Sequence, residues 1–289
     1  MRRRPHLRKV LSTGRAPVGS LVTLGRDGEV LSMEHLLDVS APITLAKCRR
    51  DGTVSRLPLH KLASRTKAEE FQMAAVRALG GVSCGYKIGA TSIEVQQLLN
   101  CQEPIHAPIL REDVLASGAT FRIPAGLLGV ECEFGFLMGR DFPKSAEFLD
   151  ATALRSAVAE CFVALEVVGR RVVAEVPLSE MSSIADFALD VAVVRGGPVP
   201  DWQRQDLGLM PVRAVLDGVI VASGTGAMVL GHPLNALLWL AKALNKRGDK
   251  LRSGEIILTG TCTGITKVAS GQVFAGCFAD FPPVQVHLA

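Results

Sequence analysis

One short segment of the chain carries two acids inside an otherwise apolar strand. Residues 130–137 read Val-Glu-Cys-Glu-Phe-Gly-Phe-Leu, so Glu131 and Glu133 lie two positions apart. Side chains alternate across a strand, which places both acids on one face, with Cα atoms roughly 6.5–7 Å apart, and turns Cys132 to the other face. Two ionised carboxylates on a half-buried face repel each other and resist desolvation. A half-buried pair of this kind therefore needs either a cation or a raised pKa.

A third acid, Glu166, stands alone in a second apolar run, Val-Ala-Leu-Glu-Val-Val at residues 163–168. Placed beside the first pair, it would complete a set of oxygen ligands, and oxygen ligands select a hard cation such as Mg²⁺ or Mn²⁺. Cys132 points away from the two acids, which disfavours zinc. The alternative is that each strand lies at a sheet edge with its acids in water, and the pattern alone leaves both interpretations open.

The rest of the sequence predicts more strands than helices. Asp-Gly turns predict two hairpins, and two further strands follow: the hairpins span 21–31 and 213–222, and the strands 255–259 and 284–288. Helical periodicity and end signals predict three helices, over 66–79 with Thr66 and Glu69 as a capping box, near 151–163, and over 233–247. We therefore expect an α+β fold with a mixed or mostly antiparallel sheet rather than a doubly wound one.

Composition excludes several classes of protein. An apolar content of 48% is ample for a buried core, and every apolar run is interrupted by charges or glycines, so we expect no membrane-spanning helix. Seven cysteines without a CxxC pair favour a reducing cytoplasm over a disulfide framework. Residues 1–26 hold seven Lys or Arg and no acid, which leaves 25 basic and 28 acidic residues in the remainder. The remainder of the chain therefore does not indicate a nucleic-acid partner. The basic residues 1–26 are interpreted as a solvated tail in preference to a transit peptide.

Motifs for other chemistries are missing from the sequence. No GxGxxG or GxxxxGK[ST] occurs at a strand-to-helix turn, and no GxSxG elbow is present. Dinucleotide, NTP and Ser-His-Asp chemistry are therefore not indicated.

Five blocks along the chain together resemble a known family. They are Gly85–Ser92 (GYKIGATS), Val130–Glu133 (VECE), Ala164–Val168 (ALEVV), Gly231–Ala236 (GHPLNA) with Trp239–Ala241, and Leu251–Gly260 (LRSGEIILTG). In this order they resemble the 2-keto-4-pentenoate hydratase and 2-oxo-3-hexenedioate decarboxylase group of the fumarylacetoacetate hydrolase superfamily. The resemblance covers residues 66–289 and implies a mixed β-roll catalytic domain, like the C-terminal domain of that superfamily, with peripheral helices. Residues 1–65 do not clearly match and are expected to be a divergent segment, hairpin-containing and partly flexible.

The resemblance also implies a function. It indicates a cytoplasmic, homo-oligomeric lyase of aromatic compound catabolism that hydrates 2-oxopent-4-enoate, or a close analogue, through a metal-stabilised enolate. Glu131, Glu133 and Glu166 would bind Mg²⁺ or Mn²⁺, and a 2-oxo acid is the expected partner. Alternatives are a 2-oxo-dicarboxylate decarboxylase, a C–C bond hydrolase, or a non-catalytic member that binds a 2-oxo acid.

Six further residues are candidates for the site through the same resemblance. Lys87, His232 and Thr259 would be catalytic, with a helix cap as an equal alternative for His232, and Gly89, Asp186 and Gly260 would bind substrate. Two segments depart from the family pattern. Residues 185–189 read Ala-Asp-Phe-Ala-Leu where Ala-Asp-Asn-Ala-Ser is common, and Ile-His-Ala at 105–107 replaces an expected acid or aromatic and glycine. These substitutions predict a different substrate or a weaker activity.

Overall fold

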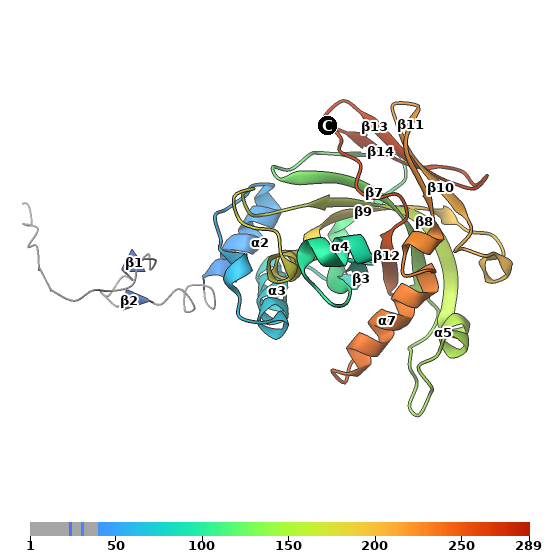
Figure 1. The fold of residues 1–289 in the computed structure, drawn as a ribbon, viewed down its shortest axis with the longest axis horizontal. Helices are drawn as coiled ribbons and strands as arrows, with labels where there is room; N and C mark the ends of the chain where they lie inside the picture. The colour runs from blue at the N-terminus through green and yellow to red at the C-terminus, as the bar shows by residue number, and fades with distance from the viewer. Residues whose placement is uncertain (1–22, 25–29, 32–39) are drawn as a thin grey trace, which may run out of the picture.

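The computed structural model describes residues 23–24, 30–31 and 40–289 of the chain, and these contain two sheets flanked by helices (Figure 1). The larger sheet has the strand order β4-β3-β12-β7-β8-β9-β5. Its strands are β3 (Ser83–Gly89), β4 (Ile105–Leu110), β5 (Val114–Ala116), β7 (Leu127–Met138), β8 (Val158–Gly169), β9 (Asp190–Pro198) and β12 (Ile256–Thr261). Because β12 runs parallel to β3 and antiparallel to β7, the sheet is mixed, as predicted.

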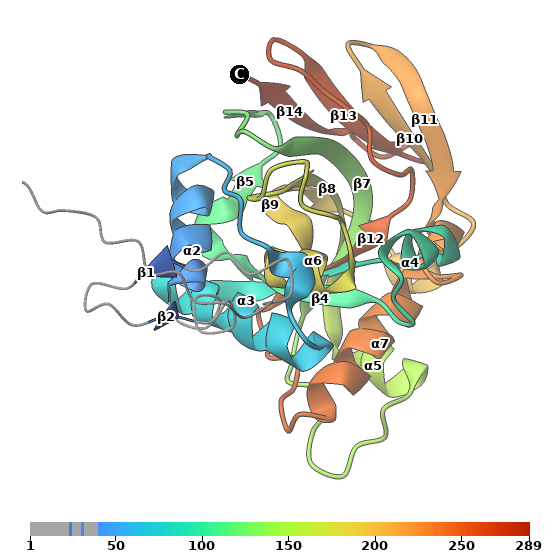
Figure 2. The same ribbon diagram turned by 60° about the vertical axis from the view of Figure 1, so that its left-hand side comes forward.

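The smaller sheet has the order β11-β10-β13-β14-β6 and packs on β7, β8 and β9. Its strands are β6 (Ala119–Phe121), β10 (Pro211–Leu216), β11 (Val219–Thr225), β13 (Val273–Phe278) and β14 (Val284–Leu288). Figure 2 shows it standing beside the strongly curved β7. The predicted hairpin at 213–222 is the β10–β11 pair, and the predicted strand at 284–288 is β14. The main hydrophobic core includes buried side chains of both sheets and of α7.

The helices occupy two sides of the larger sheet. One group consists of α2 (Ala41–Asp51), α3 (Arg65–Leu79) and α6 (Glu180–Ala185), and the other of α5 (Ala151–Ala157) and α7 (Pro233–Asn245) (Figure 2). A seven-residue helix, α4 (Ile93–Leu99), follows β3. Short 3₁₀ turns complete the set: η1 (Leu59–Lys61), η2 (Arg111–Asp113), η3 (Phe187–Leu189), η4 (Trp202–Arg204) and η5 (Gly226–Met228).

Two details of the predicted helices were wrong. The cap of α3 is Ser64, whose Oγ accepts a hydrogen bond from the Lys67 amide, so Thr66 lies inside the helix and does not form a capping box. The helix predicted near 151–163 ends at Ala157, because the β-branched Val158 begins β8 in an extended conformation. The end of α3 at Gly80, whose φ of 73° suits a glycine, agrees with the prediction.

Part of the segment upstream of residue 66 belongs to the packed unit. Helix α2 lies against α3, and Leu45 is fully buried in a second core that α3 and α6 share. In the described residues this unit therefore begins before the predicted boundary at residue 65. Strands β1 (Thr23–Leu24) and β2 (Val30–Leu31) pair antiparallel, in agreement with the predicted hairpin, whereas its turn and the expected flexible stretches lie outside the described residues.

One stretch in the described part of the chain, residues 226–245, has the length and composition of a membrane-spanning helix, contrary to our expectation. It is not one continuous helix, because Gly231, with a φ of 80°, separates η5 from α7. Helix α7 packs against α5 and β12 and buries Leu237, Leu240 and Leu244. The apolar composition of this stretch is therefore that of a core helix.

Candidate active site and metal centre

The three acids meet on adjacent central strands. Strands β7 and β8 are antiparallel and place Glu131 directly opposite Glu166, with Glu133 opposite Ala164. One carboxylate oxygen from each acid lies within 4.8 Å of the others, and all three side chains are buried. Because β7 lies between β12 and β8, and β8 between β7 and β9, the alternative of solvated acids at a sheet edge is excluded.

The opposite face of β7 is apolar, as the alternation predicted. Val130, Cys132, Phe134 and Phe136 all point into the main core, each with no exposed surface. A strand with an apolar face on one side and acids on the other can bury both faces only if the acids receive partners.

The described residues supply too few partners for these acids. The Gly260 amide donates to Glu133 Oε2 at 2.8 Å, and the Lys87 ammonium lies 3.0 Å from Glu166 Oε1. Within the described part of the chain, Glu133 Oε1 and both Glu166 oxygens have no partner with hydrogen-bond geometry. Three carboxylates thus share one ammonium, which leaves two negative charges uncompensated if all three are ionised.

Burial has the expected effect on these groups. Desolvation, followed by the charge of Glu133, raises the pKa of Glu131 to about 8. Desolvation also raises the pKa of Glu133, and it raises that of Glu166 well above the usual range. A divalent cation would cancel the two excess charges and use the orphaned oxygens, and carboxylate oxygens are the ligands that Mg²⁺ and Mn²⁺ prefer. The donor set therefore fits such an ion.

Lys87 is held from two sides. Its side chain is 3% exposed, and its ammonium donates a hydrogen bond of 2.9 Å to the Ala188 carbonyl in addition to the ion pair with Glu166. Burial acts to lower the pKa of Lys87, but the carboxylates of Glu166, Glu131 and Glu133 outweigh it, so that the pKa lies above its ordinary value. The lysine is therefore a buried cation.

The turn that supplies the Ala188 carbonyl is strained. Phe187, Ala188 and Leu189 have positive φ values of 53°, 48° and 69°, which non-glycine residues rarely adopt. Arg171 holds this turn, because its Nε donates to Asp186 Oδ1 at 2.6 Å and its guanidinium lies 5.1 Å from the centre of the Phe187 ring. The guanidinium of Arg49 lies 4.6 Å from the same ring. We call Arg49, Arg171, Asp186 and Asp190 the arginine clamp.

A cavity of about 260 Å³ opens beside the acids. Four of the predicted site residues line it, namely Lys87, Gly89, Glu131 and Gly260. Glu133 and Glu166 have no exposed surface and do not line the cavity themselves. Gly260 is required here, because its φ is 108° and a Cβ would lie 2.3 Å from Thr91 Oγ1.

Three predicted residues are not brought to this cavity. Asp186 is fully buried and directs its two carboxylate oxygens to Arg171. His232 caps α7, its Nδ1 accepting a hydrogen bond from the Leu234 amide, and Thr259 donates to the Phe134 carbonyl at 2.9 Å. The cap that was the alternative role for His232 is thus the one observed, and Asp186 has a structural role in the clamp instead of a direct place at the cavity.

Sequence reasoning missed most of the apolar wall of the cavity. Val95 and Leu99 come from α4, Ile105 from β4, Leu189 from η3 and Ile265 from the loop after β12. Ile105 and Leu189 were noted only as departures from the family pattern. Both residues line this cavity, so the two departures from the family pattern meet at one site in the fold.

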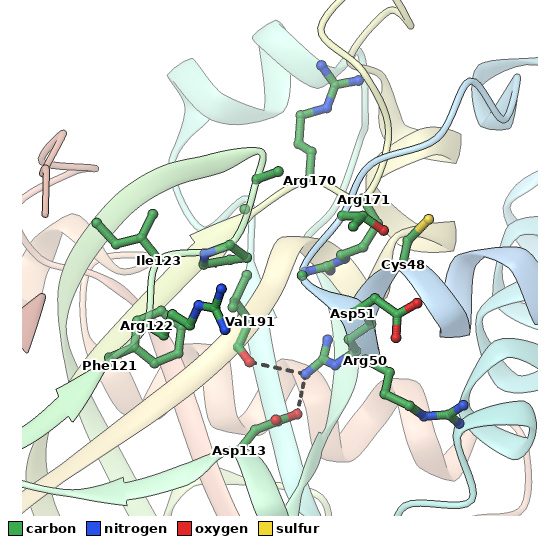
Figure 3. Close-up of a pocket in the computed structure, with 16 residues that line it drawn as sticks. Cys48, Arg50, Asp51, Asp113, Phe121, Arg122, Ile123, Arg170, Arg171 and Val191 are labelled. Carbon is green, nitrogen blue, oxygen red and sulfur yellow. Dashed lines mark hydrogen bonds and ion pairs between the residues drawn. The ribbon is translucent and has the colours of Figure 1, made fainter. Parts of the chain in front are cut away.

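The clamp borders a second cavity, of about 290 Å³, whose lining residues are all different from those of the first cavity (Figure 3). Arg49 donates to Asp113 and to the Val191 carbonyl there, and to Asp190. Figure 3 shows the side chains of Arg50 and Arg170 pointing away from the middle of the group, while that of Arg122 points inward. Most of the positive charge in this region is therefore paired or directed outward.

The fold and the buried acids define a β-roll protein with a candidate divalent-metal centre. Residues 95–284 match the family model described as fumarylacetoacetate (FAA) hydrolase C-terminal. The 2-keto-4-pentenoate hydratase of Paraburkholderia xenovorans (strain LB400) is 36% identical over 204 residues, which are 68% of this chain and 72% of that protein. The TodF product hydratase of Pseudomonas putida is 31% identical over 240 residues, 80% of this chain and 87% of that protein.

Solved structures agree on the fold. The 4-oxalocrotonate decarboxylase from Pseudomonas putida G7, complexed with magnesium and adipate, matches with a TM-score of 0.80 at 21% identity and covers 90% of this chain and all of that one. The chain therefore belongs to the fumarylacetoacetate hydrolase family, as its sequence blocks indicated. Both of the sequence relatives named above are hydratases, and this chain is an enzyme of the hydro-lyase kind.

Proposed function

We propose that this chain hydrates 2-oxopent-4-enoate, or a close analogue, with Mg²⁺ or Mn²⁺ held by Glu131, Glu133 and Glu166. The observation that carries the proposal is the set of three buried carboxylates with a single ammonium beside a cavity. The hydratase relatives supply the reaction class. The proposal includes a homo-oligomer in the cytoplasm.

The bound cation would supply Lewis-acid stabilisation of the negative charge that develops on the keto oxygen of a 2-oxo acid. Among the described residues, Lys87 is the only basic side chain that lines the cavity, and it is placed to pair with the substrate carboxylate. The Gly260 amide holds Glu133 in place, and the Ala188 carbonyl fixes the direction of the ammonium. The apolar wall excludes water from the rest of the substrate and so strengthens these charge interactions.

Incubation of the purified full chain with each of two substrates tests the proposal. In the presence of Mg²⁺ or Mn²⁺, 2-oxopent-4-enoate should be consumed, seen as loss of the dienol absorbance, and a chelator should abolish the loss. The parallel incubation contains 2-oxo-3-hexenedioate and measures CO₂. Release of CO₂ without hydration would show a decarboxylase instead, and metal and 2-oxo acid binding without turnover would show a non-catalytic member.

A further inference from the structure

The part of the cavity that lies away from Lys87 has almost no charge. Among the described residues that line the cavity, only Lys87 and Glu131 are charged, and the remaining polar side chains are the hydroxyls of Thr91, Ser92 and Thr261. The Ser92 hydroxyl is already engaged, because it accepts a hydrogen bond from the Val95 amide at the start of α4. A ligand group that leaves Lys87 and the acids therefore meets a surface without a cation.

Apolar side chains from four separate segments form that surface. They are Val95 and Leu99 of α4, Ile105 of β4, Leu189 of η3 and Ile265 of the loop after β12, and we call them the tail wall. Leu99 and Ile105 are buried, whereas Ile265 is 49% exposed and marks the side that faces solvent. The tail wall thus contains both buried side chains and one, Ile265, that is accessible to solvent.

The backbone conformation of the turn at 187–189 determines where Leu189 lies in this wall. It is the last residue of the strained turn, with a φ of 69°, and the carbonyl oxygen of its neighbour Ala188 accepts a hydrogen bond from the Lys87 ammonium. The turn therefore sets the position of the cation and of one tail-wall side chain together. The same turn would therefore position the two groups that contact a ligand, Lys87 at its carboxylate and Leu189 at its tail.

We propose that the site selects monocarboxylic 2-oxo acids with an apolar tail against dicarboxylic 2-oxo acids of the same length, and that Leu189 is a specificity-determining residue. This inference rests on the proposed function, since the 2-oxo and carboxylate end of the ligand is placed at the acids and Lys87. A second carboxylate would be moved out of water onto the apolar side chains of the tail wall, none of which carries a positive charge or a hydrogen-bond donor, and this is strongly unfavourable. A methyl or methylene group there loses only contact with water, which is favourable.

Calorimetric binding of unreactive saturated ligands to the Mn²⁺-loaded full chain tests this, because it does not depend on turnover. The decisive pair is 2-oxohexanoate and 2-oxoadipate, which have the same chain length and differ in a terminal methyl or carboxylate. We expect 2-oxohexanoate to bind on the order of 100-fold more tightly than 2-oxoadipate. We also expect it to bind more tightly than 2-oxobutanoate, by about fourfold for each additional methylene.

Substitution of one tail-wall residue should reverse the preference. Leu189→Arg places a guanidinium on the wall and should tighten 2-oxoadipate binding at least tenfold while it weakens 2-oxohexanoate binding. Leu209→Arg is the matched control, because Leu209 is 76% exposed and does not line the cavity. It should leave both affinities unchanged.

The outcomes separate the inference from the proposed function. If 2-oxobutanoate binds in a metal-dependent manner but 2-oxoadipate binds as tightly as 2-oxohexanoate, the tail-wall inference is overturned and the proposed function stands. Unchanged preference in a folded Leu189→Arg variant would remove Leu189 as the determinant. Failure of every 2-oxo acid to bind the Mn²⁺-loaded chain would overturn the proposed function and this inference with it.

Discussion

Two buried clusters of charge lie on either side of the turn at 187–189, and they differ in balance. In the arginine clamp, Arg49 lies 2.7 Å from Asp190 and Arg171 lies 2.6 Å from Asp186, so each guanidinium has its own carboxylate. In the acid cluster, three carboxylates share the ammonium of Lys87. Both clusters are buried to a similar degree, so the difference does not come from solvent.

The difference separates structural charges from functional ones. A buried ion pair roughly recovers its desolvation cost when geometry and hydrogen bonds are good, and the clamp meets this condition while it holds a strained turn. An excess of buried negative charge is relieved only when a further cation cancels it or when the carboxylates take up protons, which is the direction of their raised pKa values. The acid cluster is therefore expected to gain stability from a ligand, and the clamp is not.

Glu133→Gln should have the largest effect on activity and the least on the metal-free fold. It removes one anionic ligand with almost no change of volume, and loss of several kcal/mol of metal-dependent stabilisation corresponds to about 10³-fold in kcat/KM. Because burial raises the pKa of Glu133 above its unfolded value, its ionisation costs stability at neutral pH, and the metal-free variant should be at least as stable as the wild type. Metal titration and urea unfolding measure the two effects. Unchanged activity at limiting Mg²⁺ would contradict the assignment of the three ligands.

Lys87→Met should have the next largest effect. The substitution keeps most of the aliphatic stem and removes the ammonium, so the fold and metal binding should survive while kcat/KM falls. A charge-assisted contact in a closed site is worth about 2–4 kcal/mol, or on the order of 30- to 1,000-fold in rate. An increase of KM alone would mean that Lys87 only anchors the substrate, and wild-type kinetics would show that it has no part in the reaction.

The sequence predicted the centre of this site better than its surroundings. The face shared by Glu131 and Glu133 follows from strand periodicity, which depends on neighbours in sequence and is therefore readable. The opposition of Glu131 and Glu166 depends on the register of β7 and β8, which periodicity cannot give, so it came from the family resemblance. The predicted mixed α+β fold is confirmed, because hairpins and capped helices are local features.

The three predicted residues that do not line the cavity are directed away from it for one physical reason. Asp186, His232 and Thr259 all lie in blocks that match the family, but a side chain at a matched position can turn toward the core. For Asp186 the decisive partner is Arg171, a residue 15 positions away that no motif marked. The strained turn was equally hidden, because Phe187 and Leu189 are residues that do not ordinarily signal positive φ.

Asp186→Asn tests the structural side of the comparison. It leaves the buried Arg171 guanidinium without its carboxylate, and removal of one partner of a buried ion pair typically costs about 3–5 kcal/mol. We expect a loss of unfolding free energy of that order in urea, with the affinity for Mn²⁺ unchanged, which is the reverse of the pattern for Glu133→Gln. A variant of wild-type stability whose KM is greatly raised would instead support the direct substrate contact first predicted for Asp186.

His106 should have the smallest effect on unfolding free energy, and only at acidic pH. Unlike the charged groups of the two clusters, it is a buried group that stays neutral. It lies between Tyr86 and Trp239, with ring centroids 5.9 and 6.1 Å away, and neither ring nitrogen has a partner among the described residues. Desolvation, assisted by Arg247 and Arg65, lowers the pKa of His106 to about 4. Above pH 6.5 both the folded and the unfolded chain hold this group neutral, so it contributes nothing to pH dependence there. As the pH falls from about 6.5 to about 4, the unfolded chain takes up a proton that the folded chain does not, and the folded state loses up to about 3 kcal/mol.

His106→Phe keeps an aromatic ring without the titrating nitrogens and should flatten the decline of unfolding free energy over this range, whereas His287→Gln, at an exposed position of β14, should leave it unchanged. Parallel pH profiles for His106→Phe and the wild type would show that His106 is protonated in the folded protein, and that a buried group without partners can still be charged in this fold.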